Sequence, residues 1–181
     1  MDNKVSSILK RSLKIITSYI MSLIVFCVFA LPAFAIGQNN MPKIMPWISF
    51  VVFLLLFFSV YTEMRNFAHK EKRPQYNINP PPYKGLIYGL IGIIPILVMQ
   101  AVILLISVPA DYEDFRRRVF QLLSGPLYWI AKISGNGIYT YMIALVSIVI
   151  IAFLGYLAGY REFFLAALIR NKFGKKKIKK G

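Results

Sequence analysis

The sequence is poor in the residues that carry most metal and enzyme chemistry. It has one cysteine, Cys27, one histidine, His69, and only 7 acidic residues against 22 lysines and arginines. A single cysteine forms no disulfide within the chain and no thiolate cluster, and a lone histidine in a solvated loop is a poor metal site. The apolar segments also hold no paired carboxylate and no serine–histidine or cysteine–histidine arrangement. We therefore expect no metal, no cofactor and no enzymatic activity.

What the sequence has in abundance is apolar side chains. Hydrophobic residues make up 57% of its 181 residues and aromatic residues 15%, which is far more than a soluble domain of this size can carry. The net charge of +15 would suggest a nucleic-acid partner if the basic residues shared one soluble face. They instead cluster between apolar stretches, which is typical of the cytoplasmic loops of a membrane protein.

Four stretches are long and apolar enough to cross about 30 Å of hydrocarbon as helices. The second is the shortest, and Trp47 and Tyr61 are placed at its ends like interfacial anchors. The predicted spans are Leu13–Ile36, Pro46–Tyr61, Gly85–Pro109 and Ile138–Tyr160.

The first span also has the outline of a signal peptide. A basic start precedes its apolar run, and the small residues Ala33 and Ala35 flank Phe34. The apolar run from Ile15 to Leu31 is longer than the usual signal core of 7–15 residues. We therefore expect a retained first helix, with cleavage as the alternative.

The distribution of basic residues predicts the orientation. The amino-terminal segment, the loop 62–84 and the tail 161–181 hold 17 of the 22 basic side chains, and the two links on the other side hold five. Basic residues gather on the cytoplasmic side. We expect both termini in the cytoplasm and the segment 110–137 outside it.

A proline string precedes the third span, at Pro80 to Tyr83. Such a peptide can dock in an aromatic groove as a polyproline II helix. We interpret it instead as a spacer that holds the chain extended before the helix, with Tyr83 at the membrane interface.

Glycines three or four residues apart mark the last two spans, and this spacing places them on one helix face that permits close helix packing. We expect these two helices to pack on each other, with a homodimer interface or no special role as the alternatives. The glycines are Gly85, Gly89, Gly92, Gly155 and Gly159.

A small polar region lies deep in the third span. Pro95 frees a backbone carbonyl there, and Gln100 is the most polar side chain inside any predicted span. A buried amide needs a partner, and Ser147, Ser49, Ser59 or the freed carbonyl would serve. We expect a structural hydrogen bond, with an intramembrane polar site at Pro95, Gln100 and Ser147 as the alternative.

The outer segment predicts a short amphipathic helix on the membrane surface. Asp111 is a candidate cap, Phe115, Val119, Leu122 and Leu123 share one face, and Glu113 and Asp114 are spaced to pair with Arg117 and Arg118. The run Leu127–Ile133 is an interfacial anchor or a re-entrant lid, with the anchor as our expectation.

Two clusters could hold anionic lipid headgroups. They are Arg116, Arg117 and Arg118, and in the tail Lys172, Lys175, Lys176, Lys177, Lys179 and Lys180.

These observations predict an all-α integral membrane protein with four transmembrane helices, an extracytoplasmic interfacial helix and a single membrane domain. Its composition is typical of small multi-pass proteins of the bacterial cell membrane. We expect a non-enzymatic accessory or assembly subunit that acts by helix packing and lipid contact, with another membrane protein or a second copy as partner and no nucleic acid. A small transporter or channel subunit for a neutral or weakly charged solute is the alternative, and a lipid-binding protein is the third hypothesis.

Overall fold

The computed structural model describes residues 4–36, 41–72, 80–106, 109, 112–135 and 137–161. Within these ranges every regular element is a helix and none is a strand. The elements are α1 (Lys4–Ile36), α2 (Met41–Lys72), α3 (Lys84–Leu105), α4 (Glu113–Leu123), the 3₁₀ turn η4 (Gly125–Leu127), α5 (Tyr128–Ile133) and α6 (Ile138–Tyr160).

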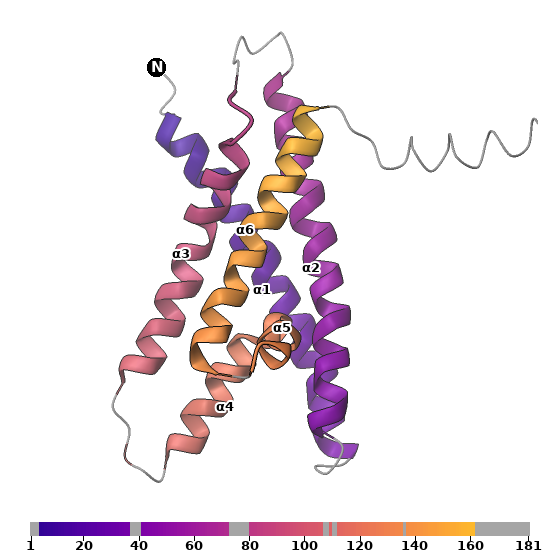
Figure 1. Cartoon of the computed structure of the whole chain (residues 1–181), viewed down its shortest axis with the longest axis vertical. Helices are drawn as coiled ribbons and strands as arrows, with labels where there is room; N and C mark the ends of the chain where they lie inside the picture. Colours follow the sequence, from indigo (N-terminus) through magenta and orange to yellow (C-terminus); the bar gives the residue numbers. More distant parts are fainter. Residues whose placement is uncertain are drawn as a thin grey trace, which may run out of the picture.

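Four of these helices are long and apolar enough to cross a membrane, which confirms the predicted number of spans. They form an elongated bundle in which α1 begins and α6 ends at the same end (Figure 1). We call this the terminal end, and we call the opposite end, where α1 finishes and α2 begins, the hairpin end. The candidate spans are Ser6–Pro32, Lys43–Lys72, Lys84–Leu105 and Tyr139–Tyr160.

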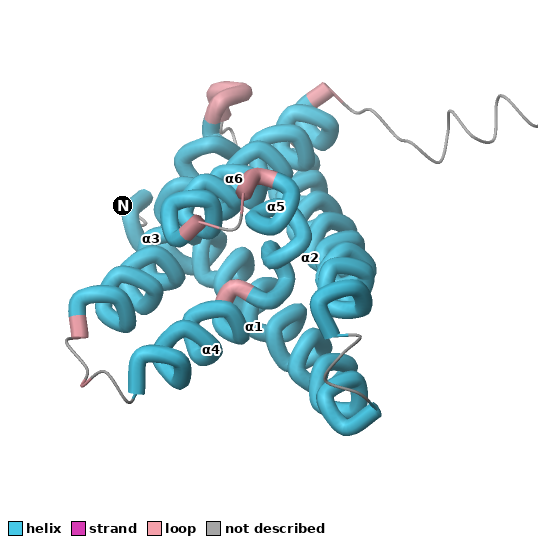
Figure 2. The backbone as a smooth tube through the Cα atoms, turned by 60° about the horizontal axis from the view of Figure 1, so that its bottom comes forward, coloured by secondary structure: helices cyan, strands magenta, loops and turns pink. Residues whose placement is uncertain are grey.

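Helix α6 lies between α2 and α3, and α1 crosses behind it to contact the same two helices. The main core runs along these contacts and contains Tyr19, Leu56, Tyr88, Leu145 and Tyr156. At this end α4, η4 and α5 form a helical hairpin, which we call the hairpin (Figure 2). Its η4 turn contacts α1 and α2, and α5 contacts α2 and α6, whereas α4 lies at the edge of the bundle beside α3. The bundle is therefore tied by its long helices and closed at one end by a hairpin.

Helix α6 has the bounds predicted for the fourth span, whereas α1 begins at Lys4 rather than Leu13 and α3 ends at Leu105 rather than Pro109. Helix α2 departs most from its predicted bounds. It continues past Tyr61 to Lys72, through the first half of the predicted cytoplasmic loop 62–84, so His69 is a helical residue. The reason is a change of pattern: after the uniformly apolar run, Met64, Ala68 and Glu71 are buried on one face while the other positions are more exposed. Spacings of three and four residues keep side chains on one helix face, so the charged stretch is an amphipathic continuation of the span.

The glycines of α3 lie against two different helices of this chain. A Cβ atom added to Gly89 would lie 2.9 Å from the Cα atom of Val149 in α6, and one added to Gly85 would meet the Cβ atom of Tyr156 in the same helix. One added to Gly92 would instead lie 3.0 Å from the Cβ atom of Ile15 in α1. The backbone of α3 therefore approaches α6 and α1 closely.

The glycines of α6 face α2 rather than α3. A Cβ atom added to Gly155 would lie 2.6 Å from the carbonyl oxygen of Tyr61, and one added to Gly159 would meet the carbonyl oxygen of Arg65. Helices α3 and α6 pack together as predicted, but only one of the two glycine pairs lies in that contact. All five glycines named in the sequence thus face helices of this chain.

Candidate functional site

A carboxylate is buried near the terminal end of the bundle. Glu71, in the last turn of α2, has a side chain that is 1% exposed. It forms ion pairs with Arg11 of α1 and with Lys84 of α3, whose Nζ atom lies 3.0 Å from its Oε2 atom. The hydroxyls of Tyr88 in α3 and Tyr156 in α6 donate hydrogen bonds of 2.7 Å to its two oxygens. We call these five residues the ionic cluster.

Each long helix contributes at least one residue to the ionic cluster. The contacts occupy all the acceptor sites of the Glu71 carboxylate. Each oxygen of Glu71 has one cation and one phenol as its partners, which matches the acceptor sites of an ionised carboxylate. Arg11 also donates a hydrogen bond of 2.8 Å to the hydroxyl of Tyr88. Because burial penalises an unpaired charge heavily, these contacts make the position of Glu71 dependent on all four helices.

A second set of polar contacts holds the hairpin inside the bundle. Its tip, residues 124–127, is buried throughout. The hydroxyl of Tyr19 donates a hydrogen bond of 2.8 Å to the carbonyl oxygen of Leu123, and that of Ser49 donates one of 2.7 Å to the carbonyl oxygen of Gly125. The same Ser49 oxygen accepts a bond of 3.0 Å from the backbone N–H of Trp129. Side chains of α1 and α2 therefore satisfy backbone groups where the helix is broken.

The same geometry places the run Leu127–Ile133, which was predicted to be an interfacial anchor or a re-entrant lid, against the bundle. Leu127 and Ala131 are fully buried, and the tip contacts α1, α2 and α6. The start of the run is thus packed between the long helices, whereas Ile133 at its end is exposed. Irregular backbone in a membrane protein is tolerated where protein covers it, and here the surrounding helices cover the tip.

Gln100 in α3 finds its partner in the hairpin and not in another span. Its Nε2 atom donates a hydrogen bond of 3.0 Å to the hydroxyl of Ser124, while its buried Oε1 atom accepts none from the described residues. Ser147 instead donates to the carbonyl oxygen of Ala144 in its own helix, and Pro95 is exposed. The structure therefore does not gather Pro95, Gln100 and Ser147 into one site.

The contact with Gln100 also indicates how far the tip of the hairpin, residues 124–127, extends into the bundle along α3. Gln100 lies about 7 Å from the end of α3 at Leu105, at a rise of ~1.5 Å per residue. The hydrogen bond to Ser124 places the tip at this level, inside the bundle near its hairpin end. Within the described part of the chain, the hairpin and the ionic cluster thus bind the helices together near opposite ends.

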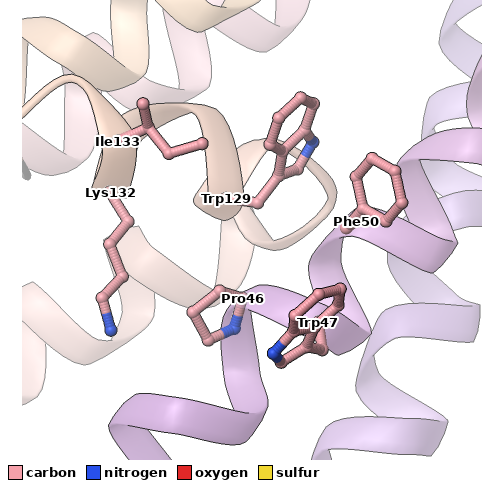
Figure 3. A pocket seen from close by; sticks show the side chains of 6 residues that line it. All are labelled: Pro46, Trp47, Phe50, Trp129, Lys132 and Ile133. Carbon is pink, nitrogen blue, oxygen red and sulfur yellow. The ribbon is translucent and has the colours of Figure 1, made fainter.

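An apolar groove of about 350 Å³ opens beside the hairpin (Figure 3). Its walls come from the start of α2 and from α5, and both tryptophans of the chain are among them. The indole of Trp129 lies against Phe50, with ring centroids 5.2 Å apart in an edge-to-face arrangement. The lining residues are Pro46, Trp47, Phe50, Trp129, Lys132 and Ile133.

One of the two ion pairs predicted for α4, Glu113 with Arg117, is not formed, and the other, Asp114 with Arg118, involves a side chain outside the described residues. Glu113 contacts Arg116, at 3.3 Å, instead of Arg117. Arg116 also donates a hydrogen bond of 3.1 Å to the carbonyl oxygen of Ile106 just after α3. Arg117 and Arg118 are exposed. Arg116 therefore joins the start of α4 to the end of α3, because its guanidinium contacts Glu113 one turn earlier in α4 and Ile106 just after α3.

The remaining predicted groups lie at the terminal end or outside the described residues. Pro80 is buried, whereas Pro82 and Tyr83 are exposed immediately before α3. The backbone N–H of Lys84 donates a hydrogen bond to the carbonyl oxygen of Pro81, so the string leads directly into the helix. Asp111, the side chain of Asp114 and the six tail lysines from Lys172 to Lys180 lie outside the described residues.

No protein-family model, curated protein or solved structure matches this chain. The four apolar helices define it as a candidate multi-pass membrane protein, and any finer assignment depends on the geometry of its sites.

Proposed function

We propose that the protein is a non-enzymatic accessory or assembly subunit of a membrane complex. The supporting observation is that several of its buried polar side chains form contacts with other elements of the same chain. Tyr19, Ser49 and Gln100, which point into the bundle, are engaged in contacts that hold the hairpin, and Glu71 is engaged in the ionic cluster. A bundle tied near both ends in this way suits a rigid scaffold better than a carrier that changes its shape during transport.

The way in which the scaffold would meet a partner differs from the expectation drawn from the sequence. The glycine faces are covered by helices of the same chain, so a partner would contact other surfaces. Large apolar side chains are exposed along α1, among them Leu13, Met21 and Val28. Apolar helix faces of this kind contact either lipid or another membrane helix.

Native mass spectrometry tests the accessory function. We expect the protein, tagged and expressed at its natural level and extracted gently from its own membrane, to carry a foreign subunit in a fixed stoichiometry. The foreign subunit should remain bound in each of several mild detergents, because helix interfaces in membranes are held by close packing of complementary surfaces and not by apolar character alone. A monomer or a homo-oligomer without any foreign chain would contradict the proposal.

A small transporter or channel subunit for a neutral or weakly charged solute is the second proposal, and one observation favours it. Gln100 is fully buried, and its Oε1 atom accepts no hydrogen bond from the described residues. An unpaired buried acceptor is costly, so a solute hydroxyl or amide that donates to it would be held favourably. Glu71 also adds a buried ionisable group, which is often functional in a membrane protein.

Cysteine accessibility separates the two proposals. In a Cys27→Ser background, we expect the thiol of Gln100→Cys to resist a charged, water-soluble methanethiosulfonate reagent until the protein is denatured, because Gln100 is fully buried. Ser134→Cys, at an exposed position in the turn after α5, is the matched positive control. Labelling of Gln100→Cys in the folded protein would overturn this expectation and favour a water-filled path.

The placement in the cell is part of the same proposal. We infer a multi-pass protein of a bacterial cell membrane with both termini in the cytoplasm, because the basic residues are concentrated beside the terminal end. In this orientation the groove and α4 lie at the outer interface, and α4 lies with its exposed Phe115 and Leu122 toward lipid. Anionic headgroups would then contact the lysine-rich tail and the arginines Arg116, Arg117 and Arg118.

A further inference from the structure

The groove beside the hairpin combines an apolar channel with one cation. Trp47, Phe50 and Trp129 form much of its wall, and Trp47 and Ile133 are largely exposed. Apolar walls of this kind fit a hydrocarbon chain, because burying apolar surface is favourable whatever its detailed shape. Tryptophans are also enriched at the level of the lipid headgroups, which places the mouth of the groove near that depth.

Lys132 supplies the charge. It belongs to the last turn of α5, next to the buried Ala131, and its side chain extends along the rim beside Pro46 (Figure 3). Because the buried Ala131 anchors α5 in the bundle, the backbone of Lys132 is fixed beside the apolar wall and its side chain lines the groove. A strongly hydrated ammonium on a flexible stem commonly contacts phosphate as a point charge.

We propose that this groove is a binding site for an anionic phospholipid. One acyl chain lies against Trp47 and Trp129, and the headgroup phosphate lies against the ammonium of Lys132. A zwitterionic lipid offers the same acyl chain, but its own choline offsets the phosphate charge. The site therefore distinguishes lipids by headgroup and not by chain. The inference does not depend on the accessory function, since a lipid can occupy the groove whether or not a partner chain binds elsewhere.

Both tryptophans of the chain line the groove, so intrinsic fluorescence reports on it directly. The experiment reconstitutes the full chain in vesicles of phosphatidylcholine with increasing fractions of brominated phosphatidylglycerol or brominated phosphatidylcholine, whose bromine atoms quench nearby indoles. We expect about a fivefold preference for the brominated anionic lipid, which corresponds to about 1 kcal/mol for one lysine near an anionic headgroup. Trp47→Phe and Trp129→Phe variants assign the quenching to each wall.

Charge variants identify the cation responsible. Lys132→Gln should remove the preference while leaving quenching by brominated phosphatidylcholine unchanged, and Lys132→Arg should keep it. Lys70→Gln, on an exposed position near the other end of α2, is the matched control and should keep it too. Equal quenching by the two lipids in the unaltered protein, or an undiminished preference in Lys132→Gln, would overturn the proposal. Exclusion of both brominated lipids from the tryptophans would also do so, and would indicate that a partner chain covers the groove.

Discussion

Glu71→Ala is expected to lower the free energy of unfolding by about 3–5 kcal/mol, the range for breaking a buried ion pair by removal of one partner. The variant leaves Arg11 and Lys84 as neighbouring cations without their common carboxylate, and it removes the acceptor of the Tyr88 and Tyr156 hydroxyls. Reversible unfolding in mixed detergent micelles, followed by tryptophan fluorescence, measures the change.

Two comparisons separate this effect from the loss of any acid in α2. Glu63→Gln changes a carboxylate of the same helix that is not in the ionic cluster, and we expect a change within about 0.5 kcal/mol. Combining Glu71→Gln with Arg11→Gln should cost less than the sum of the single changes, because both remove the same interaction. Additive costs, or equal costs at Glu63 and Glu71, would show that the cluster does not act as a unit.

Gly125→Ala is expected to destabilise the inserted hairpin, by about 1–3 kcal/mol as for other overpacked cores. An added Cβ atom would overlap the ring of Phe26, and that ring is itself buried against α2 in a small cluster with Val52. Relief of the clash requires the tip to retreat, which would stretch the 2.7 Å hydrogen bond from Ser49 to the carbonyl oxygen of Gly125. The same unfolding measurement detects the loss of stability.

The matched control is Gly137→Ala, since a Cβ atom there meets no atom nearer than 4.0 Å and the backbone φ of −81° is acceptable to alanine. A second test removes the ring. Phe26→Ala is costly by itself because it leaves a cavity, but in that background the additional cost of Gly125→Ala should fall close to zero. If the cost of Gly125→Ala were the same with and without the ring, the contact with Phe26 would not be its cause.

The four spans could be predicted from the sequence because each is a long apolar run, and the bounds of α6 follow from its flanking glycine and arginine. The end of α2 could not be predicted in the same way. Hydropathy falls after Tyr61, although the helix continues to Lys72. The signal that identifies the continuation is the helical spacing of Met64, Ala68 and Glu71, which becomes convincing only when the facing helices are known.

The ionic cluster and the inserted hairpin show why sites are harder to predict than spans. Glu71 and Arg11 are 60 positions apart in the sequence, and Tyr156 is further still. Each residue alone resembles an ordinary charged or aromatic residue near a membrane interface. The sequence identifies Gln100 as a buried amide in need of a partner. It also predicts that the segment 110–137, which contains Ser124, lies outside the membrane, because short apolar runs do not reveal whether they lie on a bundle or inside it.

The positions of the ionic-cluster residues along the chain set the order in which their contacts can form during synthesis. Chains are synthesised from the amino terminus, and segments begin to associate before the remainder is complete. Arg11 is therefore already available when Glu71 emerges, Lys84 and Tyr88 arrive with the next helix, and Tyr156 arrives last. A cationic partner for the carboxylate therefore precedes it along the chain, and the hydrogen bond from Tyr156 can form only after the last helix has docked.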